Sequence, residues 1–179
     1  RVQFEWGGGQ EARRGAGVSL PGVPGFGAGS NGFVAWGFTN VTGDFEDFIR
    51  IEPHPTDPKL YRFGPGESDY EPYGDATEEI IIKGAASKIV NYRTTRWGRV
   101  IDQDLAGHPL VLKWSALNPE TVNINILSMI DARTIEEAVE VARRWWGPPQ
   151  NVMIAGVDGR IAYLMSGWIP ERQGYDGRL

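Results

Sequence analysis

Hydrophobic residues along this chain occur mostly in short runs that are separated by glycine and proline. A short run of apolar and β-branched residues bounded by turn residues is typical of a β-strand. Such runs predict strands at 33–36, 79–83, 88–94, 97–101, 110–114, 152–155 and 161–164. Asp158-Gly159 lies between the last two runs, and this dipeptide is a strong signal for a hairpin turn. The pattern therefore predicts a strand-rich protein with several hairpins.

One segment has the periodicity of a helix. Thr134 and Glu137 form a capping-box pattern, in which each side chain can bond to the other residue's free backbone N–H group. Apolar residues then recur at helical spacing on one face: Ile135, Ala138, Val139, Ala142 and Trp146. A Gly-Pro-Pro sequence follows, so a helix over 134–146 is predicted. A shorter helix is predicted at 118–120, with asparagine as the cap and proline in the first turn, although 122–126 alternates as a strand does.

The first 30 residues are rich in glycine, most densely at Gly7-Gly8-Gly9 and at 21–29. Glycine and proline destabilise a helix interior by ~1 and ~3 kcal/mol relative to alanine, so no regular helix is expected there. A phosphate-binding loop at 25–29 is the alternative, but the segment lacks the Lys-Ser/Thr sequence and the following helix of such loops. We therefore expect tight turns against a sheet. The fold class predicted for the whole chain is α+β, with 1–179 as a single unit.

Composition excludes several classes of function. The net charge of the 179 residues is −5, which argues against a nucleic-acid partner because no basic excess exists to neutralise phosphates. No apolar run has the length of a membrane span, so no membrane association is expected. The sequence contains no cysteine, which excludes disulfides, thiol catalysis and cysteine-ligated metals. Composition does not assign a cellular compartment.

Two neighbouring features have the residue types for chemistry. The predicted strand 33–36 enters a Gly-Phe-Thr-Asn turn that ends at Asn40, and a sharply turned backbone can direct an N–H group outward. Asp44, Glu46 and Asp47 follow in a short acidic loop, and closely spaced carboxylates suit a hard cation such as calcium. Each feature also has an ordinary interpretation, as a turn at the end of a strand and as a solvated acidic surface. Spacing alone leaves both interpretations open.

Several motifs occur along the chain in a fixed order. The first is GSNGFVAWGFTNVTGDFEDFIRIE, from Gly29 to Glu52. The others are RTTRWGRVI at 93–101, LVLKWSAL at 110–117, PQN at 149–151, AGVDGRIAY at 155–163, and IPER with GYDGR at 169–178. This order resembles the penicillin acylase (penicillin amidase) family of self-processing amidohydrolases, over nearly the whole chain. Arg99 and Gly156 depart from the family's pattern, which usually has proline and aspartate at these positions.

The resemblance implies an N-terminal-nucleophile hydrolase with an αββα fold, of which this chain would be an internal segment of the large subunit. The parent enzyme would hydrolyse an acyl amide, in a β-lactam antibiotic or an acyl-homoserine lactone, through an acyl-enzyme on an N-terminal serine. The partners of this chain would be the small-molecule acyl amide, the remaining acylase segments and the small subunit. A periplasmic or secreted location is implied by the same resemblance.

Roles for individual residues also follow from the resemblance. The backbone N–H of Asn40 would be one donor of the oxyanion hole, a role that can lower the barrier by ~2.7–4 kcal/mol. Phe38 and Gln150 would border the acyl pocket. A structural calcium ion would be bound by four groups: Asp44, the carbonyl oxygen of Glu46, Asp47 and the carbonyl oxygen of Pro170.

A nucleophile is not found at a matching position. Gly29-Ser30-Asn31 has the sequence of the family's cleavage site, but it lies too close to the AWGFTN segment. We therefore expect the nucleophile outside these residues and predict no amidase activity for the isolated chain.

The alternative function is that of a non-catalytic, calcium-stabilised binding or scaffold module. In such a module tryptophans would line a sugar or peptide groove. Burial of Trp36, Trp114 and Trp146 would favour the acylase segment, whereas exposure of all three on one face would favour the module.

Overall fold

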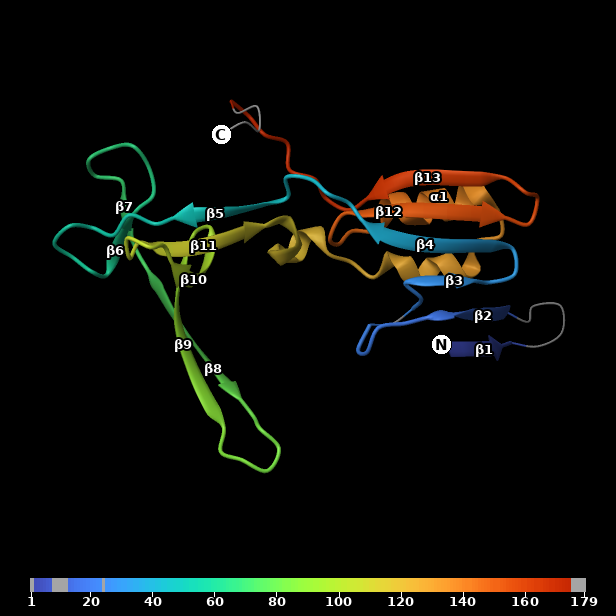
Figure 1. Cartoon of the computed structure of the whole chain (residues 1–179), viewed down its shortest axis with the longest axis horizontal. Helices are drawn as coiled ribbons and strands as arrows, with labels where there is room; N and C mark the ends of the chain where they lie inside the picture. Colours follow the sequence, from blue (N-terminus) through green and yellow to red (C-terminus); the bar gives the residue numbers. More distant parts are fainter. Residues whose placement is uncertain (1, 8–12, 24, 175–179) are drawn as a thin grey trace. The chain divides into compact units, whose positions relative to one another are not determined.

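The computed structural model describes residues 2–7, 13–23 and 25–174, which form two compact units (Figure 1). Unit 1 contains the residues up to Phe45 and those from Ser115 onward, and unit 2 is Glu46–Trp114. The expectation that 1–179 acts as a single unit stays a prediction. Parts of two sequence motifs, Gly8-Gly9 and 175–178, lie outside the described residues.

Unit 1 is a six-stranded antiparallel sheet of order β1-β2-β3-β4-β12-β13. Its strands are β1 (Val2–Trp6), β2 (Arg13–Val18), β3 (Ala28–Ser30), β4 (Val34–Asn40), β12 (Gln150–Gly156) and β13 (Ile161–Ser166). Its helical segments are η2 (Ser115–Leu117), η3 (Pro119–Thr121), η4 (Asn125–Asp131) and α1 (Ile135–Arg144). Helix α1 packs against β12 and β13, and Figure 1 shows it on one face of the sheet. The strand-rich α+β class predicted from the sequence is confirmed.

The core of unit 1 lies between the sheet and its helical segments. Alternate residues of β4 and β12 point into it, and α1 contributes the residues of its apolar face. The buried members are Phe26, Val34, Trp36, Met129, Ala132, Ile135, Ala138, Ala142, Val152 and Ile154. Burial of a large apolar side chain contributes ~1.5–3 kcal/mol, so this cluster is the main source of stability in unit 1.

Glycines in the first strands make room for a buried aromatic ring. A Cβ atom at Gly17 would lie 2.8 Å from the Phe26 ring and 2.4 Å from the carbonyl oxygen of Ala28. A Cβ atom at Gly15 would also lie 2.8 Å from the Phe26 ring. The glycine-rich start therefore forms strands β2 and β3, on which Phe26 rests, and not only the tight turns expected from its composition.

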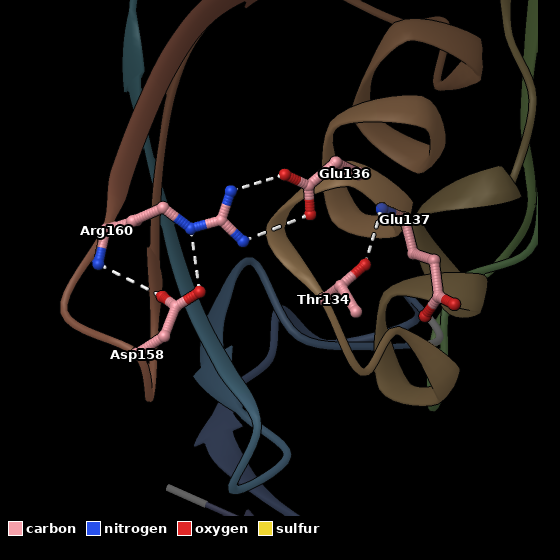
Figure 2. A network of polar contacts seen from close by, with 5 residues as sticks. All are labelled: Thr134, Glu136, Glu137, Asp158 and Arg160. Atoms are coloured by element: carbon pink, nitrogen blue, oxygen red, sulfur yellow. Dashed lines mark hydrogen bonds and ion pairs between the residues drawn. The ribbon is translucent and has the colours of Figure 1, made fainter.

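Helix α1 begins with the predicted cap. The Glu137 backbone N–H donates to the Thr134 hydroxyl at 3.2 Å (Figure 2). The Glu137 carboxylate accepts from the Arg133 backbone N–H at 2.7 Å, one residue earlier than the capping box requires. The predicted hydrogen bond to the Thr134 hydroxyl is thus confirmed. The predicted bond of the Glu137 carboxylate is displaced by one residue, from the Thr134 N–H to the Arg133 N–H. The shorter predicted helix is also confirmed as η3, where Asn118 accepts from the Glu120 N–H.

The end of α1 differs from the prediction. The helix stops at Arg144, whose carbonyl oxygen accepts from the side-chain amides of Asn123 and Asn125 at 2.8 and 2.9 Å. These two amides replace the next helical turn as partners of the carbonyl. Trp146 therefore lies outside the helix and is 38% exposed, so its predicted place on the buried face is wrong. Trp145 instead packs against the core cluster.

An ionic network fixes the turn between β12 and β13 to the start of α1 (Figure 2). The Arg160 guanidinium donates to the Glu136 carboxylate at 2.5 Å and to the Asp158 carboxylate at 2.7 Å. These hydrogen bonds lower the pKa of both carboxyl groups and raise the pKa of Arg160. Gly159, with φ +81°, completes the predicted Asp-Gly hairpin turn.

Unit 2 contains a five-stranded antiparallel sheet of order β5-β11-β10-β9-β8 and a small hairpin, β6-β7. Its strands are β5 (Glu46–Arg50), β6 (Leu60–Arg62), β7 (Tyr70–Pro72), β8 (Gly74–Ile80), β9 (Lys88–Thr95), β10 (Gly98–Gln103) and β11 (Pro109–Trp114). The predicted strands at 88–94, 97–101 and 110–114 are confirmed. The strand predicted at 79–83 lies earlier in the chain than expected. Strand β8 begins at Gly74 and ends at Ile80, and residues 81–83 lead into the hairpin turn.

The buried core of unit 2 is small and includes a tyrosine. Its buried members among the described residues are Ile51, Tyr61 and Val111. The Tyr61 hydroxyl accepts from the Arg96 backbone N–H at 2.7 Å and donates to the Glu71 carboxylate. Burial raises the pKa of Tyr61, and the bond to Glu71 raises it further. Because both bonds join this hydroxyl to other segments of unit 2, it is a structural group of that unit.

None of the helical segments among residues 2–7, 13–23 and 25–174 has the length and hydrophobicity of a membrane-spanning helix.

Candidate functional site

The candidate site lies at the end of strand β4 in unit 1. The sequence predicted that this strand would give way to a turn over 37–40. Instead β4 continues to Asn40 and pairs residue by residue with β12, from Val34 opposite Gly156 to Asn40 opposite Gln150. The predicted turn is wrong because continuous pairing with β12 outweighs the low strand propensity of glycine and asparagine. The chain leaves the sheet only after Asn40.

Three amide side chains meet at this strand end. The Gln150 side-chain amide donates to the Asn40 side-chain oxygen at 3.1 Å. The Asn151 side-chain amide donates to the Asn40 backbone carbonyl oxygen at 3.0 Å, and the Tyr163 hydroxyl donates to the Asn151 side-chain oxygen at 2.7 Å. Asn40 is therefore held through its backbone and its side chain while remaining exposed to solvent.

Phe38 lies beside this network on the helix-covered face of the sheet. Its ring is half-buried and its centroid is 4.7 Å from that of Trp145, with the two ring planes tilted by 38°. Phe38, Asn40 and Gln150 share one face, because alternate residues of a strand point to the same side. The structure thus brings together the three residues that were assigned to the oxyanion hole and the acyl pocket.

Ser30 and Asn31 form the turn that leads into β4. The Ser30 hydroxyl donates to the Val34 carbonyl oxygen at 3.0 Å and accepts from the Gly32 N–H at 3.1 Å. The Asn31 side-chain amide is buried and donates to three carbonyl oxygens in and next to η4, those of Met129, Ile130 and Ala132. Its oxygen accepts from the N–H groups of Phe33 and Val34, both at 2.9 Å. Both side chains thus have structural partners in this turn.

The predicted calcium ligands are divided between the two units. Asp44 and Pro170 belong to unit 1, whereas Glu46 and Asp47 belong to unit 2. Glu46 and Asp47 lie on strand β5, opposite Trp114 and Lys113, so their predicted place in a loop is wrong. Pairing with β11 extends the strand into the acidic segment.

Arg172 is a polar partner of the first of these ligands. Its guanidinium donates to the Asp44 carboxylate at 2.9 Å and to the Asp44 carbonyl oxygen at 3.3 Å. The four predicted ligand groups are all oxygens, which is the donor type that calcium prefers. A cation at Asp44 would share this carboxylate with Arg172. Within the described residues, no three His, Asp or Glu side chains gather closely enough to form a metal site by themselves.

The tryptophans give a mixed result. Trp36 is 5% exposed, and its indole N–H donates to the Phe26 carbonyl oxygen at 3.0 Å. Trp114 is half-buried in unit 2. Trp146 is exposed and packs edge-on against Trp168, with ring centroids 5.6 Å apart. Because Trp36 is buried, the three do not form the exposed aromatic face expected of a binding module.

Three residues of this region were not predicted from the sequence: Asn151, Tyr163 and Arg172. All three stand inside quoted motifs, Asn151 in PQN, Tyr163 at the end of AGVDGRIAY and Arg172 in IPER, but roles were assigned only to other residues of the motifs. Tyr163 stands opposite Met153 and is a diagonal neighbour of Asn151, a relation that depends on strand register.

Comparison with known proteins gives a consistent family assignment. The family model described as penicillin amidase matches residues 8–179. The penicillin acylase 2 proenzyme of Pseudomonas sp. (strain SE83) is 30% identical over 166 residues, covering 91% of this chain and 21% of that protein. The acyl-homoserine lactone acylase QuiP of Pseudomonas aeruginosa is 29% identical over 185 residues, covering 91% of this chain and 22% of that protein. The chain therefore spans about a fifth of the length of these curated relatives.

A solved structure supports the fold. The thermostable penicillin G acylase from Alcaligenes faecalis aligns with a TM-score of 0.77 at 22% identity, over 96% of this chain and 31% of that chain. Since the family model extends over nearly all of its residues, the chain belongs to the penicillin amidase family.

Proposed function

We propose that the protein carrying this chain is an amidohydrolase that cleaves acyl amides through an acyl-enzyme. The nucleophile is a serine outside this chain, and residues 1–179 supply an oxyanion donor, cation ligands and part of the acyl pocket. The observation that carries the proposal is the way in which Gln150 and Asn151 hold Asn40 at the end of β4. Family membership supplies the class of reaction.

The Asn40 backbone N–H is the proposed oxyanion donor. Negative charge develops on the carbonyl oxygen of an amide as a nucleophile attacks it, and a donor already fixed in place stabilises that charge without reorganising. The amide of Asn151 fixes the carbonyl of Asn40, and the amide of Gln150 fixes its side chain. Tyr163 in turn holds Asn151. This arrangement supports a rigid donor on an exposed strand end.

The acyl pocket is proposed to include Phe38 and Gln150. Small-molecule pockets combine apolar and aromatic walls with a few polar groups that fix orientation. The Phe38–Trp145 pair provides the aromatic wall, and the Gln150 amide provides a polar group on the same face. The relatives that are named as acylases of penicillin and of acyl-homoserine lactones suggest an acyl amide as the substrate. By the same resemblance, the enzyme is periplasmic or secreted and includes a small subunit.

The face of the unit 1 sheet that points away from α1 supports the proposed αββα fold. Met153, Tyr163 and Met165 project from this face and are 50%, 60% and 54% exposed. Such side chains are normally buried when two sheets stack. We expect a second sheet of the longer protein to cover them.

Calcium is proposed as a structural ion held by Asp44, Asp47 and the carbonyl oxygens of Glu46 and Pro170. Bound there, it would supply positive charge that neutralises the two carboxylates. Calcium at about 100 times its dissociation constant should stabilise the protein by ~2.7 kcal/mol. Thermal unfolding with calcium or with a chelator measures this effect. Asp44→Asn should abolish the response and Asp57→Asn should retain it, whereas equal responses in both variants would contradict the site.

Activity of the longer protein tests the catalytic role of Asn40. Asn40→Pro deletes the backbone N–H and should lower kcat for an acyl anilide by about 10²–10³-fold. Thr42→Pro places proline in the exposed loop just beyond the strand and serves as the matched control. Full activity of Asn40→Pro, or no cleavage of any acyl amide by the unmodified protein, would refute the proposal. Hydrolysis by residues 1–179 alone, abolished by Ser30→Ala, would place the nucleophile in this chain.

A further inference from the structure

The turn that leads into strand β4 contains the single Asn-Gly pair of the sequence, Asn31-Gly32. Asparagine is chemically labile in such a pair, because the backbone nitrogen of the next residue can attack the carbon of its side-chain amide. Glycine leaves that nitrogen accessible, since it has no Cβ atom. The other asparagines are each followed by a larger residue: Asn40, Asn91, Asn118, Asn123, Asn125 and Asn151.

The fold requires both residues of this pair. Gly32 has φ +90°, a backbone angle that favours glycine, and a Cβ atom there would lie 3.2 Å from Nε of Arg14. Asn31 is 5% exposed, and its amide nitrogen donates to three carbonyl oxygens that lie 98–101 residues later in the chain, at 2.6–3.2 Å. The turn is therefore built on a pair of residues that is reactive in an open chain.

The closed turn protects the same pair. The attacking group, the Gly32 backbone N–H, donates to the Ser30 hydroxyl at 3.1 Å. The Asn31 side chain makes five hydrogen bonds, so its amide carbon cannot turn toward the Gly32 nitrogen without breaking them. Burial of the side chain also keeps away the water that the second step of the reaction consumes. Opening of the turn removes all three protections together.

We propose that Asn31 is a modification site whose deamidation is controlled by the folding of unit 1. When the turn opens, the Gly32 nitrogen bonds to the side-chain carbon of Asn31. The bond from this carbon to the side-chain nitrogen breaks, and ammonia leaves with the proton of the Gly32 N–H. Water then opens the cyclic imide and leaves aspartate or isoaspartate. This inference does not depend on the proposed catalytic function.

Neither product can close the turn as before. Aspartate replaces the amide donor by a carboxylate oxygen, which would face the carbonyl oxygens of Met129, Ile130 and Ala132. A buried charge without a compensating partner is strongly unfavourable. Isoaspartate adds a methylene group to the main chain between residues 31 and 32. Deamidation thus converts a reversible opening of unit 1 into a permanent one.

Incubation of the 179-residue chain at mildly alkaline pH, with and without urea, tests the control by folding. Trypsin releases residues 15–50 as one peptide, in which mass spectrometry follows Asn31 and, as the internal control, Asn40. Asn31 should deamidate at least ~100-fold more slowly without urea, because reaction there requires opening of the core. Asn40 should keep its amide in both samples. Equal rates for Asn31 with and without urea, or equal rates for the two asparagines in urea, overturn the proposal.

Two variants separate the chemistry from the protection. Gly32→Ala should slow the reaction in urea, where the stability of the folded turn does not matter, because a Cβ atom hinders the attacking nitrogen. Ser30→Ala should leave the rate in urea unchanged and raise the rate without urea by about 2–10-fold, the factor that corresponds to one lost hydrogen bond. An unchanged rate for Gly32→Ala in urea, or for Ser30→Ala without urea, contradicts the proposed step.

Refolding tests the consequence of the modification. After increasing times in urea, the fraction of chains that regain the native fluorescence on dilution should fall in step with the fraction deamidated at Asn31. Asn31→Asp should show this loss without incubation. Asn91→Asp is the matched control, because Asn91 is exposed and accepts a hydrogen bond from the Thr77 hydroxyl that aspartate can also accept. Complete refolding of the deamidated chain or of Asn31→Asp would refute the permanent opening.

Discussion

The two units of this chain contain sheets of similar size that are stabilised by different contacts. Unit 1 covers one face of its sheet with α1 and η4 and encloses a cluster that includes Trp36, Val152 and Ile154. Unit 2 has no α-helix among its described residues, and its buried cluster is Ile51, Tyr61 and Val111. Burial of apolar side chains therefore stabilises unit 1, whereas the stability of unit 2 requires other contacts as well.

Contacts between arginine side chains and aromatic rings supply part of the stability of unit 2. Each of the following pairs places a guanidinium over a ring at 3.6–4.9 Å from its centroid: Arg62–Tyr70, Arg93–Tyr73, Arg96–Phe63 and Arg99–Tyr92. Exposed contacts of this kind contribute ~0.5–1 kcal/mol each. A sheet without a helical layer can thus cover its rings with guanidinium groups, which remain hydrated. The comparison predicts that substitutions in the apolar core have their largest effect in unit 1, and that the stability of unit 2 depends on polar contacts of its aromatic residues.

The largest effect is expected from a cavity in unit 1. Ile154 is 1% exposed, and Ile154→Ala should lower the free energy of unfolding by ~2–5 kcal/mol through lost burial and an unfilled cavity. Urea unfolding followed by tryptophan fluorescence measures the change. Ile161→Ala, on the neighbouring strand, is the control because Ile161 is 73% exposed. Equal losses for both variants would remove the basis of the comparison.

A polar group inside unit 1 gives the next largest effect. Asn31→Ala would leave three carbonyl oxygens and two N–H groups without the Asn31 side chain as partner, at a cost of about 2–3 kcal/mol. Asn91→Ala on exposed strand β9 is the control, with an expected change below ~0.5 kcal/mol. Hydrogen exchange of the β4 amides should rise in the first variant alone. Unchanged exchange there would mean that Asn31 does not fix the start of β4.

Tyr61→Phe tests the polar core of unit 2. The substitution removes the acceptor of the Arg96 N–H and the donor to Glu71, and should cost about 1–2 kcal/mol. Tyr163→Phe in unit 1 is the control because this hydroxyl is exposed. Hydrogen exchange resolves the two units, and we expect faster exchange in β9 and β10. An unchanged unit 2 would show that its stability is apolar, like that of unit 1.

Acid should produce the smallest and most diffuse effect. Hydrogen bonds from Arg96 lower the pKa of Glu71, and those from Arg160 lower the pKa of Glu136. A carboxyl whose folded pKa lies below its ordinary value of 4.5 stabilises the fold above that pH, and this contribution is lost as pH falls through the folded pKa. Thermal unfolding between about pH 6 and pH 3 should therefore show a falling Tm below about pH 4.5.

Matched variants sharpen this comparison. Glu71→Gln should remove more of the acid dependence than Glu136→Gln, because the Glu71 side chain is 25% exposed and that of Glu136 is 63% exposed. Water screens the more exposed ion pair more strongly. A larger change for Glu136→Gln would mean that ionic contacts matter more to unit 1 than to unit 2.

Local signals predicted the elements that depend on nearby residues. The cap at Thr134, the Asp158-Gly159 turn and the strands on either side of it all occur as expected. Predictions failed where a distant partner decided the outcome. Strand β4 runs on to Asn40 because β12 pairs with it, and α1 stops at Arg144 because Asn123 and Asn125 bind its carbonyl.

The candidate site shows the same division. Resemblance of the motifs selected Asn40, Phe38 and Gln150, which the fold brings together on one face of the sheet. The same motifs did not reveal that Asn151 holds the Asn40 carbonyl or that Tyr163 holds Asn151. Those contacts follow from the register of three adjacent strands, which motif order does not specify.

The sequence by itself determined the α+β class, the helix that begins after Thr134 and the family resemblance, because periodicity, caps and motif order are local properties. Only the tertiary structure decided which strand ends extend, which side chains hold Asn40, and which groups enclose the Asn31 side chain. The physical reason is that strand pairing and burial depend on residues far apart in the chain, whose combined contacts outweigh the preferences of any short segment.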